Sequence, residues 1–335
     1  MAWGPREHAG AGAAARAPPL PSRPVEAAAT RAAPLPSRPI EEFSSVFVAA
    51  PDGLRLHVRR YGSRTASALP VVCLPGLART AADFHDLAAA LAADPAAPRL
   101  VVALDYRGHG RSQYDRNPGN YRLSVFLADV AAVLTALELA PAVFVGTSHG
   151  GLIAMLLAVE RPTAIAGVVL NDIGPVIDPR GLLRIRRRVG QLPVARSFAE
   201  GGDILRWLMG GQFPRLEPHD WIALARRTWR EHRGRLVPDY DVKLARSLYR
   251  ANLERPPTLW HEFDALARVP LMIVRGANSD MLAAATLEGM VARRSLVDVA
   301  VVANQGHAPL LAEARLIRHI AAFVASCDAG ASAAG

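Results

Sequence analysis

A pentapeptide near the middle of the chain, Gly146-Thr-Ser-His-Gly150, limits the possible folds more than any other feature. It follows an apolar run at residues 142–145, which predicts a buried strand, and precedes residues 152–159, which predict a helix. A G-x-S-x-G sequence in that position predicts a sharp turn, the nucleophile elbow, whose crowded backbone requires glycine at both ends. The alternative is an ordinary glycine-rich turn. The flanking elements favour the elbow, with Ser148 held in a strained conformation at the positive end of the helix.

Two residues that could complete a catalytic triad follow Ser148 along the chain. Asp280 follows an apolar run at residues 270–275, and His307 follows another at residues 296–302. Both therefore lie at the C-terminal ends of predicted strands, where parallel sheets gather their active sites. A serine hydroxyl needs a base to take its proton, imidazole titrates near neutrality, and a carboxylate fixes the imidazole tautomer. We expect Ser148 as nucleophile, His307 as base and Asp280 as acid.

Other residues could fill these positions. Asp172, which follows an apolar run at residues 164–170, is the alternative acid, and Asp280 could instead cap a helix that begins at Met281. The alternative bases are His109 and His149. We expect His149 to point away from the adjacent serine and to line the pocket, and His109 to have a structural role.

Five short segments combine into a recognisable pattern: Leu74-Pro-Gly-Leu77, Asp105-Tyr-Arg-Gly-His-Gly-Arg-Ser112, Gly146 to Gly150, Arg275-Gly-Ala-Asn-Ser-Asp280 and Gly306-His307. Together they resemble the α/β-hydrolase family, in its esterase, lactonase and haloperoxidase-like group, over residues 43–324. The resemblance implies an α/β fold with a mostly parallel eight-stranded sheet flanked by helices, and a helical lid. It also implies an oxyanion hole formed by the backbone N–H groups of Leu77 and His149. Many members have His-Gly where this chain has Pro75-Gly76, but the hole needs only a backbone N–H.

The alternation of strand and helix patterns predicts where the core lies. Apolar periodicity predicts a parallel sheet with helices on both faces, built from residues 43–175 and 266–328. Between these two parts, at residues 176–265, the pattern becomes helical and rich in aromatic residues, which predicts a lid over the active site. Trp207, in the most apolar cluster of this segment, is the expected pocket residue. The run of arginines at residues 186–188 is expected to lie on a solvated helix face.

Residues 1–42 differ in composition from the rest of the chain. They are rich in Ala, Pro and Arg, and the segment at residues 19–26 recurs almost unchanged at residues 34–41. Such a segment has too few large apolar side chains to offset the entropy lost on ordering, so we expect a disordered tail. It lacks the apolar stretch of a secretory signal.

The composition limits which partners, ligands and compartment the sequence predicts. The formal net charge is +9, but the chain has one lysine, Lys243, and its arginines are spread along the whole sequence, which disfavours a nucleic-acid-binding stripe. Two cysteines give neither a disulfide framework nor metal-ligand spacing, so we expect a cytoplasmic protein without a metal. The apolar stretch at residues 143–159 contains Ser148, His149 and three glycines, which favours core elements over a membrane span. No cofactor motif is found.

These observations predict a serine hydrolase that cleaves a small carboxylic ester or lactone through an acyl-enzyme. One alternative is a hydrolase that uses the same triad on a carbon–carbon bond of a β-diketone-like acid. Another is a catalytically silent binding protein of this fold, whose usual mark is an incomplete triad. The sequence does not determine the oligomeric state.

Overall fold

The computed structural model describes residues 43–65, 67–250 and 258–332, so the predicted tail at residues 1–42 lies outside the described part. Its centre is an eight-stranded sheet with the order β1-β2-β4-β3-β5-β6-β9-β10. The strands are β1 (Ser44–Ala49), β2 (Arg55–Tyr61), β3 (Val71–Leu74), β4 (Val101–Asp105), β5 (Ala142–Thr147), β6 (Ile165–Asn171), β9 (Leu271–Gly276) and β10 (Asp298–Val302). Strand β2 runs opposite to the other seven strands, which are parallel to one another, and this confirms the predicted mostly parallel sheet.

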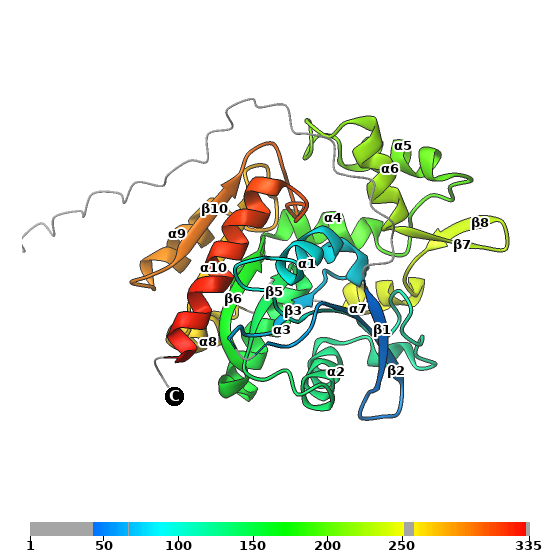
Figure 1. Ribbon diagram of the computed structural model, residues 1–335. Coiled ribbons are helices and arrows are strands. Elements are labelled where there is room, and N and C mark those ends of the chain that lie inside the picture. The colour runs from blue at the N-terminus through cyan, green and yellow to red at the C-terminus, as the bar shows by residue number, and fades with distance from the viewer. Residues whose placement is uncertain (1–42, 66, 251–257, 333–335) are drawn as a thin grey trace, which may run out of the picture.

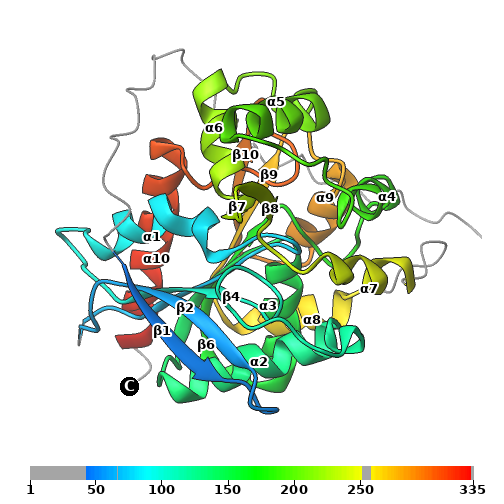
Figure 2. The ribbon, with the colours of Figure 1, turned by 90° about the vertical axis from the view of Figure 1, so that its right-hand side faces the viewer.

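Helices cover both faces of the sheet (Figures 1 and 2). On one face lie α1 (His85–Ala92) and α10 (Ala314–Ser332), and on the other α2 (Leu123–Ala136), α3 (His149–Glu160), α8 (Trp260–Ala265) and α9 (Ala284–Ala292). Each layer has its own apolar cluster because successive residues of a strand point to opposite faces. Short 3₁₀ helices occupy Ala81–Phe84, Pro118–Asn120, Pro162–Ala164, Val242–Leu244 and Leu266–Arg268.

The segment between β6 and β9 has an apolar cluster of its own in residues 195–236 (Figure 1), whereas its Val189, Tyr240 and Leu244 pack into a cluster of the core. It contains α4 (Pro179–Arg188), α5 (Phe198–Met209), α6 (Pro218–Arg226) and α7 (Ala245–Arg250), followed by α8 of the core layer. It also contains an antiparallel pair, β7 (Trp229–His232) and β8 (Arg235–Pro238), which the sequence pattern did not predict. The buried residues Trp229 and Leu236 anchor this hairpin on the α5–α6 pair.

Helix α9 begins later than the sequence predicts. It begins at Ala284, with Ala283 as its N-cap residue, instead of at Met281. Asp280 therefore does not cap this helix. Residues 277–283 form a turn that carries Ser279 and Asp280 from the end of β9 across the neighbouring end of β6.

Candidate active site

Ser148 lies on a turn between β5 and α3, as the pentapeptide predicts. Its backbone has φ 51° and ψ −113°, a conformation that an L-residue adopts only under strain. A Cβ at Gly150 would lie 2.0 Å from the carbonyl oxygen of Leu74, and one at Gly146 would lie 2.6 Å from the carbonyl carbon of Gly150. Only glycine fits at these two positions, so the turn holds the hydroxyl up at the carboxyl edge of the sheet.

A hydrogen-bonded chain links this serine to a histidine and a carboxylate. Ser148 Oγ lies 2.9 Å from Nε2 of His307, and Nδ1 of His307 lies 2.9 Å from Oδ2 of Asp172. A carboxylate only accepts hydrogen bonds, so Nδ1 carries the proton and Nε2 is left to accept the serine hydroxyl. The side chains of His307 and Asp172 are 6% and 0% exposed. In this arrangement the imidazole can take the serine's proton.

The structure brings Asp172, and not Asp280, to the histidine. Two further donors hold its carboxylate: the N–H of Gly276 reaches Oδ1 at 2.8 Å, and the hydroxyl of Ser279 reaches Oδ2 at 2.6 Å. Asp172 itself has φ 56°, which turns its side chain at the end of β6. Sequence reasoning missed Ser279, which lies directly before the residue that it favoured.

Asp280, the acid expected from the sequence, has a different partner. Its two oxygens accept hydrogen bonds from Nε and an Nη of Arg184 on α4, at 2.6 and 2.7 Å. Burial opposes ionisation, but the hydrogen bonds and charge of Arg184 outweigh it and lower the pKa of Asp280. The structure therefore contradicts the expected pairing of Asp280 with His307 and places the alternative, Asp172, there. The reason is local: the turn after β9 directs Ser279 toward β6 and Asp280 toward the insertion.

The two backbone N–H groups expected to form an oxyanion hole lie beside the serine. Leu77 lines the same pocket as Ser148, and His149 is the first residue of α3. Neither N–H has a hydrogen-bond acceptor within the described ranges. The loop that carries Leu77 is fixed by the N–H of Ala78, which donates to Nε2 of His109 at 3.2 Å.

The two alternative bases have no contact with the serine hydroxyl. His109 is fully buried, and its Nδ1 lies 2.9 Å from the carbonyl oxygen of Arg107. The ring of His149 packs edge-on against Tyr106 and Phe126, with centroids 5.5 and 5.0 Å away. Burial lowers the pKa of His149 to about 3, which keeps this imidazole neutral.

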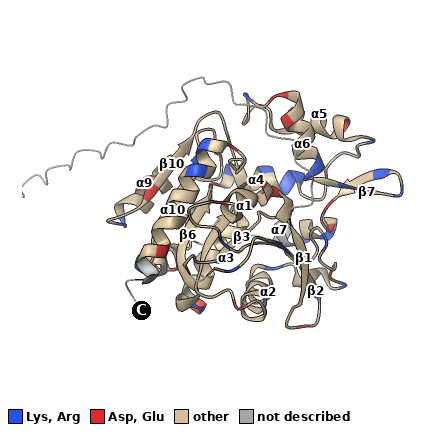
Figure 3. Ribbon diagram, viewed as in Figure 1, with Lys and Arg blue, Asp and Glu red and all other residues tan. Residues whose placement is uncertain are grey.

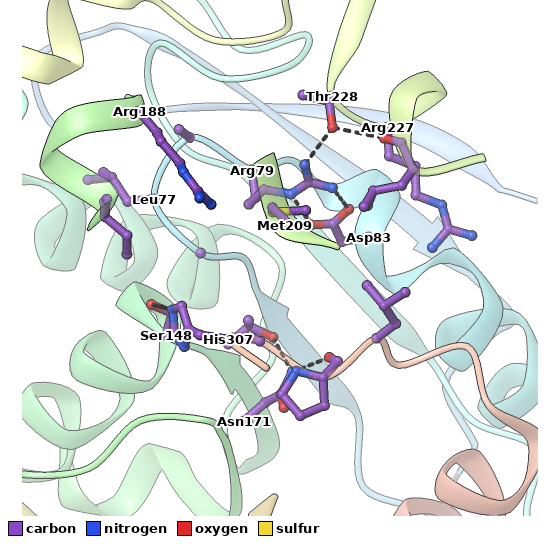
Figure 4. A pocket seen from close by; sticks show the side chains of 18 of the residues that line it. Leu77, Arg79, Asp83, Ser148, Asn171, Arg188, Met209, Arg227, Thr228 and His307 are labelled. Atoms are coloured by element: carbon purple, nitrogen blue, oxygen red, sulfur yellow. Dashed lines mark hydrogen bonds and ion pairs between the residues drawn. The ribbon is translucent and has the colours of Figure 1, made fainter. Parts of the chain in front are cut away.

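A pocket of about 200 Å³ opens above Ser148 and His307 (Figure 4). Its apolar lining combines the core loop with the insertion, in Leu77, Ile185, Leu192, Met209, Phe213 and Leu224. Its charged lining consists of Arg79, Asp83, Arg184, Arg188 and Arg227, so the pocket has more basic than acidic groups.

Trp207 does not line this pocket. It is 81% exposed on the outer face of α5, and the expectation that it limits the substrate is wrong. Leu205 is buried and Met209 lines the pocket, since residues four apart share one face of a helix, whereas Trp207 lies between them on the opposite face. The prediction for Arg188 is also wrong. Its side chain reaches the pocket from α4, whereas the sequence predicted a solvated helix face.

Within the described ranges, no cluster of three or more His, Cys, Asp or Glu residues could hold a metal ion. None of the described helices is both long and apolar enough to cross a membrane. Basic residues occur on the core and on the insertion alike (Figure 3).

The sequence matches the Alpha/beta hydrolase family over residues 71–319. The chain belongs to this family. It is similar to a 3-hydroxybutyrate-oligomer hydrolase of Cupriavidus necator, with 32% identity over 270 residues that cover 78% of this chain and 89% of that protein.

Two other relatives support the same family. A crystal structure of an α/β-hydrolase from Novosphingobium aromaticivorans is 37% identical, covers 84% of this chain and 98% of its own, and superposes with a TM-score of 0.77. A 2-(acetamidomethylene)succinate hydrolase of Mesorhizobium japonicum is 27% identical over 210 residues, which cover 62% of this chain and 71% of that protein. The chain is an α/β-hydrolase with hydrolase relatives.

Proposed function

We propose that this hydrolase cleaves a small carboxylic ester through Ser148, His307 and Asp172, with an acyl-enzyme as intermediate. The observation that carries the proposal is the hydrogen-bonded chain from Ser148 Oγ through both ring nitrogens of His307 to Asp172, on the wall of a largely apolar pocket. A complete triad speaks against a silent binding protein, whose usual mark is a missing member.

The chemistry follows from the geometry. The hydroxyl of Ser148 attacks the ester carbonyl while its proton passes to Nε2 of His307, and Asp172 stabilises the resulting imidazolium. The N–H groups of Leu77 and His149 donate hydrogen bonds to the carbonyl oxygen as it becomes negative. Each such donor lowers the barrier by about 3 kcal/mol. The intermediate then collapses, and the proton on His307 goes to the departing alkoxide to release the alcohol.

In the second half of the cycle, water hydrolyses the acyl-enzyme. Water enters the position that the alcohol has left, and His307 takes a proton from it as it attacks the acyl-enzyme carbonyl. The second tetrahedral intermediate releases Ser148 with its proton restored, and the product leaves as a carboxylic acid. A lactone would follow the same steps with both products in one molecule.

The similarity to a 3-hydroxybutyrate-oligomer hydrolase suggests which esters to try first. Short linear esters of hydroxy acids suit a pocket of about 200 Å³ better than bulky acyl groups. The dimer of 3-hydroxybutyrate is our first candidate substrate, beside p-nitrophenyl esters of increasing acyl length.

The test combines labelling with turnover. A fluorophosphonate probe should label the wild-type protein at Ser148, and Ser148→Ala should abolish labelling and lower ester turnover by several orders of magnitude. Circular dichroism should show that the variant is folded. Labelling of another serine in Ser148→Ala, or undiminished turnover, would overturn the assignment. Hydrolysis of β-diketone acids with inert esters would favour the carbon–carbon alternative.

A further inference from the structure

Among the described residues, one charged side chain of the pocket has no ion-pair partner. The guanidinium of Arg188, the last residue of α4, donates to the carbonyl oxygen of Leu208, and its other terminal nitrogen is buried without a hydrogen bond within the described ranges. None of the ion pairs found among the described residues includes Arg188. Figure 4 shows this side chain extending from α4 into the pocket, on the wall opposite Ser148 and His307.

The other three arginines of the pocket are neutralised. Arg79 pairs with Asp83, with Nε 2.6 Å from Oδ2. Arg184 pairs with Asp280 and Arg227 with Asp86, each with a shortest distance of 2.6 Å. Of the four arginines that line the pocket, Arg188 alone has no ion pair with a described residue. Arg188 is half-buried, and a charge partly withdrawn from water is costly unless an anion pairs with it, so the site favours an anionic ligand.

We propose that the ester cleaved at Ser148 carries a free carboxylate remote from the reacting carbonyl, and that Arg188 binds this carboxylate. This inference rests on the proposed ester hydrolysis and adds the substrate class. A guanidinium presents parallel N–H donors that match the two oxygens of a carboxylate, and such charge-assisted bonds are the strong ones. The nitrogen of Arg188 that lacks a protein partner would then gain one.

The surroundings of Arg188 also favour an anion over a neutral group. Burial, followed by the charge of neighbouring Arg184, lowers the pKa of Arg188. Since the carboxylate of Asp280 is already held by two bonds from Arg184, it does not neutralise both cations. A bound carboxylate would relieve this repulsion, whereas a neutral amide would not.

The experiment compares esters that differ only in charge. Monoethyl succinate, glutarate and adipate are each compared with the ester in which the free carboxylate is replaced by a carboxamide of the same shape. The 3-acetoxybutyrate anion and its amide extend the test to a carboxylate on the alcohol side. For the preferred length, kcat/KM of the wild-type protein should be at least about 10-fold higher for the acid than for the amide, the low end for a hydrogen bond to a charged group.

Variants separate Arg188 from its neighbours. Arg188→Gln should lower kcat/KM for the acid by at least about 10-fold more than for the amide and so remove the preference, whereas Arg188→Lys should keep part of it because it keeps the charge. Exposed Arg187→Gln is the matched control and should behave as wild type. A wild-type protein without preference in any pair, or an equal loss on acid and amide in Arg188→Gln, would overturn the inference. If Arg188→Gln does not fold, Arg188→Met takes its place, and a preference for the acid as large as in the wild-type protein would overturn the inference.

A second readout does not depend on turnover. Glutarate should slow the labelling of Ser148 by a fluorophosphonate in the wild-type protein, and Arg188→Gln should lose this protection. Labelling without hydrolysis of any ester would contradict the proposed function, while protection by glutarate that depends on Arg188 would still support the anion site. Equal protection in both proteins would contradict the site and leave ester hydrolysis standing.

Discussion

Replacing Asp172 by Asn should reverse the tautomer of His307, and the hydrogen bonds around the carboxylate show why. The N–H of Gly276 can only donate, so the oxygen of the new amide must occupy the position of Oδ1, 2.8 Å away. The amide NH₂ then faces Nδ1 of His307 at the former Oδ2 position, while the hydroxyl of Ser279 can turn and accept. A donor opposite Nδ1 forces the ring proton onto Nε2.

An imidazole protonated at Nε2 cannot accept the proton of Ser148, although every side chain stays in place. The loss of turnover for this tautomer change is about 10⁴-fold, or about 5.5 kcal/mol of barrier. Asp280→Asn instead weakens an ion pair in which both side chains are partly exposed, at 24% for Asp280 and 18% for Arg184. Its amide oxygen still accepts from Arg184, so we expect a loss of less than about 10-fold.

The assay is kcat for p-nitrophenyl butanoate at saturating concentration, with a thermal melt of each variant. Ser279→Ala is a useful third variant because it removes one donor from Asp172 and keeps the carboxylate, so its loss should not exceed about 100-fold. The reasoning fails if folded Asp280→Asn loses more turnover than folded Asp172→Asn. It also fails if Asp172→Asn keeps more than about a tenth of the wild-type rate.

Two further predictions concern the insertion. Met209→Ala should enlarge the pocket and shift the chain-length profile of p-nitrophenyl esters toward longer acyl groups. Trp207→Ala, at an exposed position, should change neither this profile nor the melting temperature appreciably. A shifted profile in Trp207→Ala and an unchanged one in Met209→Ala would place Trp207 in the pocket. Burial, followed by the charge of Asp105, raises the pKa of Asp239 to about 6. A carboxyl group with a raised pKa contributes stability that is fully present below the ordinary pKa of 3.8 and is lost as the pH rises through about 6. Asp239→Asn should therefore raise the melting temperature relative to wild type at pH 8 but not at pH 4. An equal effect at both pH values would contradict this assignment.

The sequence predicted those parts of the fold that depend on local patterns. Strands β5, β6, β9 and β10 follow from apolar runs, and the elbow follows from a steric requirement that only glycine meets at positions 146 and 150. His307 follows from its place after the last strand. These features need no knowledge of how distant segments pack, because each is encoded within about ten residues of the chain.

The predictions for Trp207 and Arg188 were wrong because they considered residue type and not the direction in which each side chain points around its helix. Trp207 belongs to an apolar cluster, yet it lies about 200° around the helix from Leu205, whose face is buried. The arginine run at residues 186–188 was placed on one solvated face, although consecutive helical residues point about 100° apart. Three adjacent arginines cannot share a face, and Arg188 is the one that reaches the pocket.

The acid could not be determined in this way, because two aspartates follow strands that are neighbours in the sheet. Strands β6 and β9 pair directly, so their carboxyl ends bring Asp172 and Asp280 to the same region. The choice depends on a register of one residue in the turn after β9. Ser279 points across to Asp172, and the next residue points away to Arg184. Ser279 thus supports the carboxylate that follows β6, from the turn where the sequence led us to expect the acid. Asp280 beside it pairs with Arg184 of the insertion, so among the described residues it is Arg188 that remains for the anionic substrate that we propose.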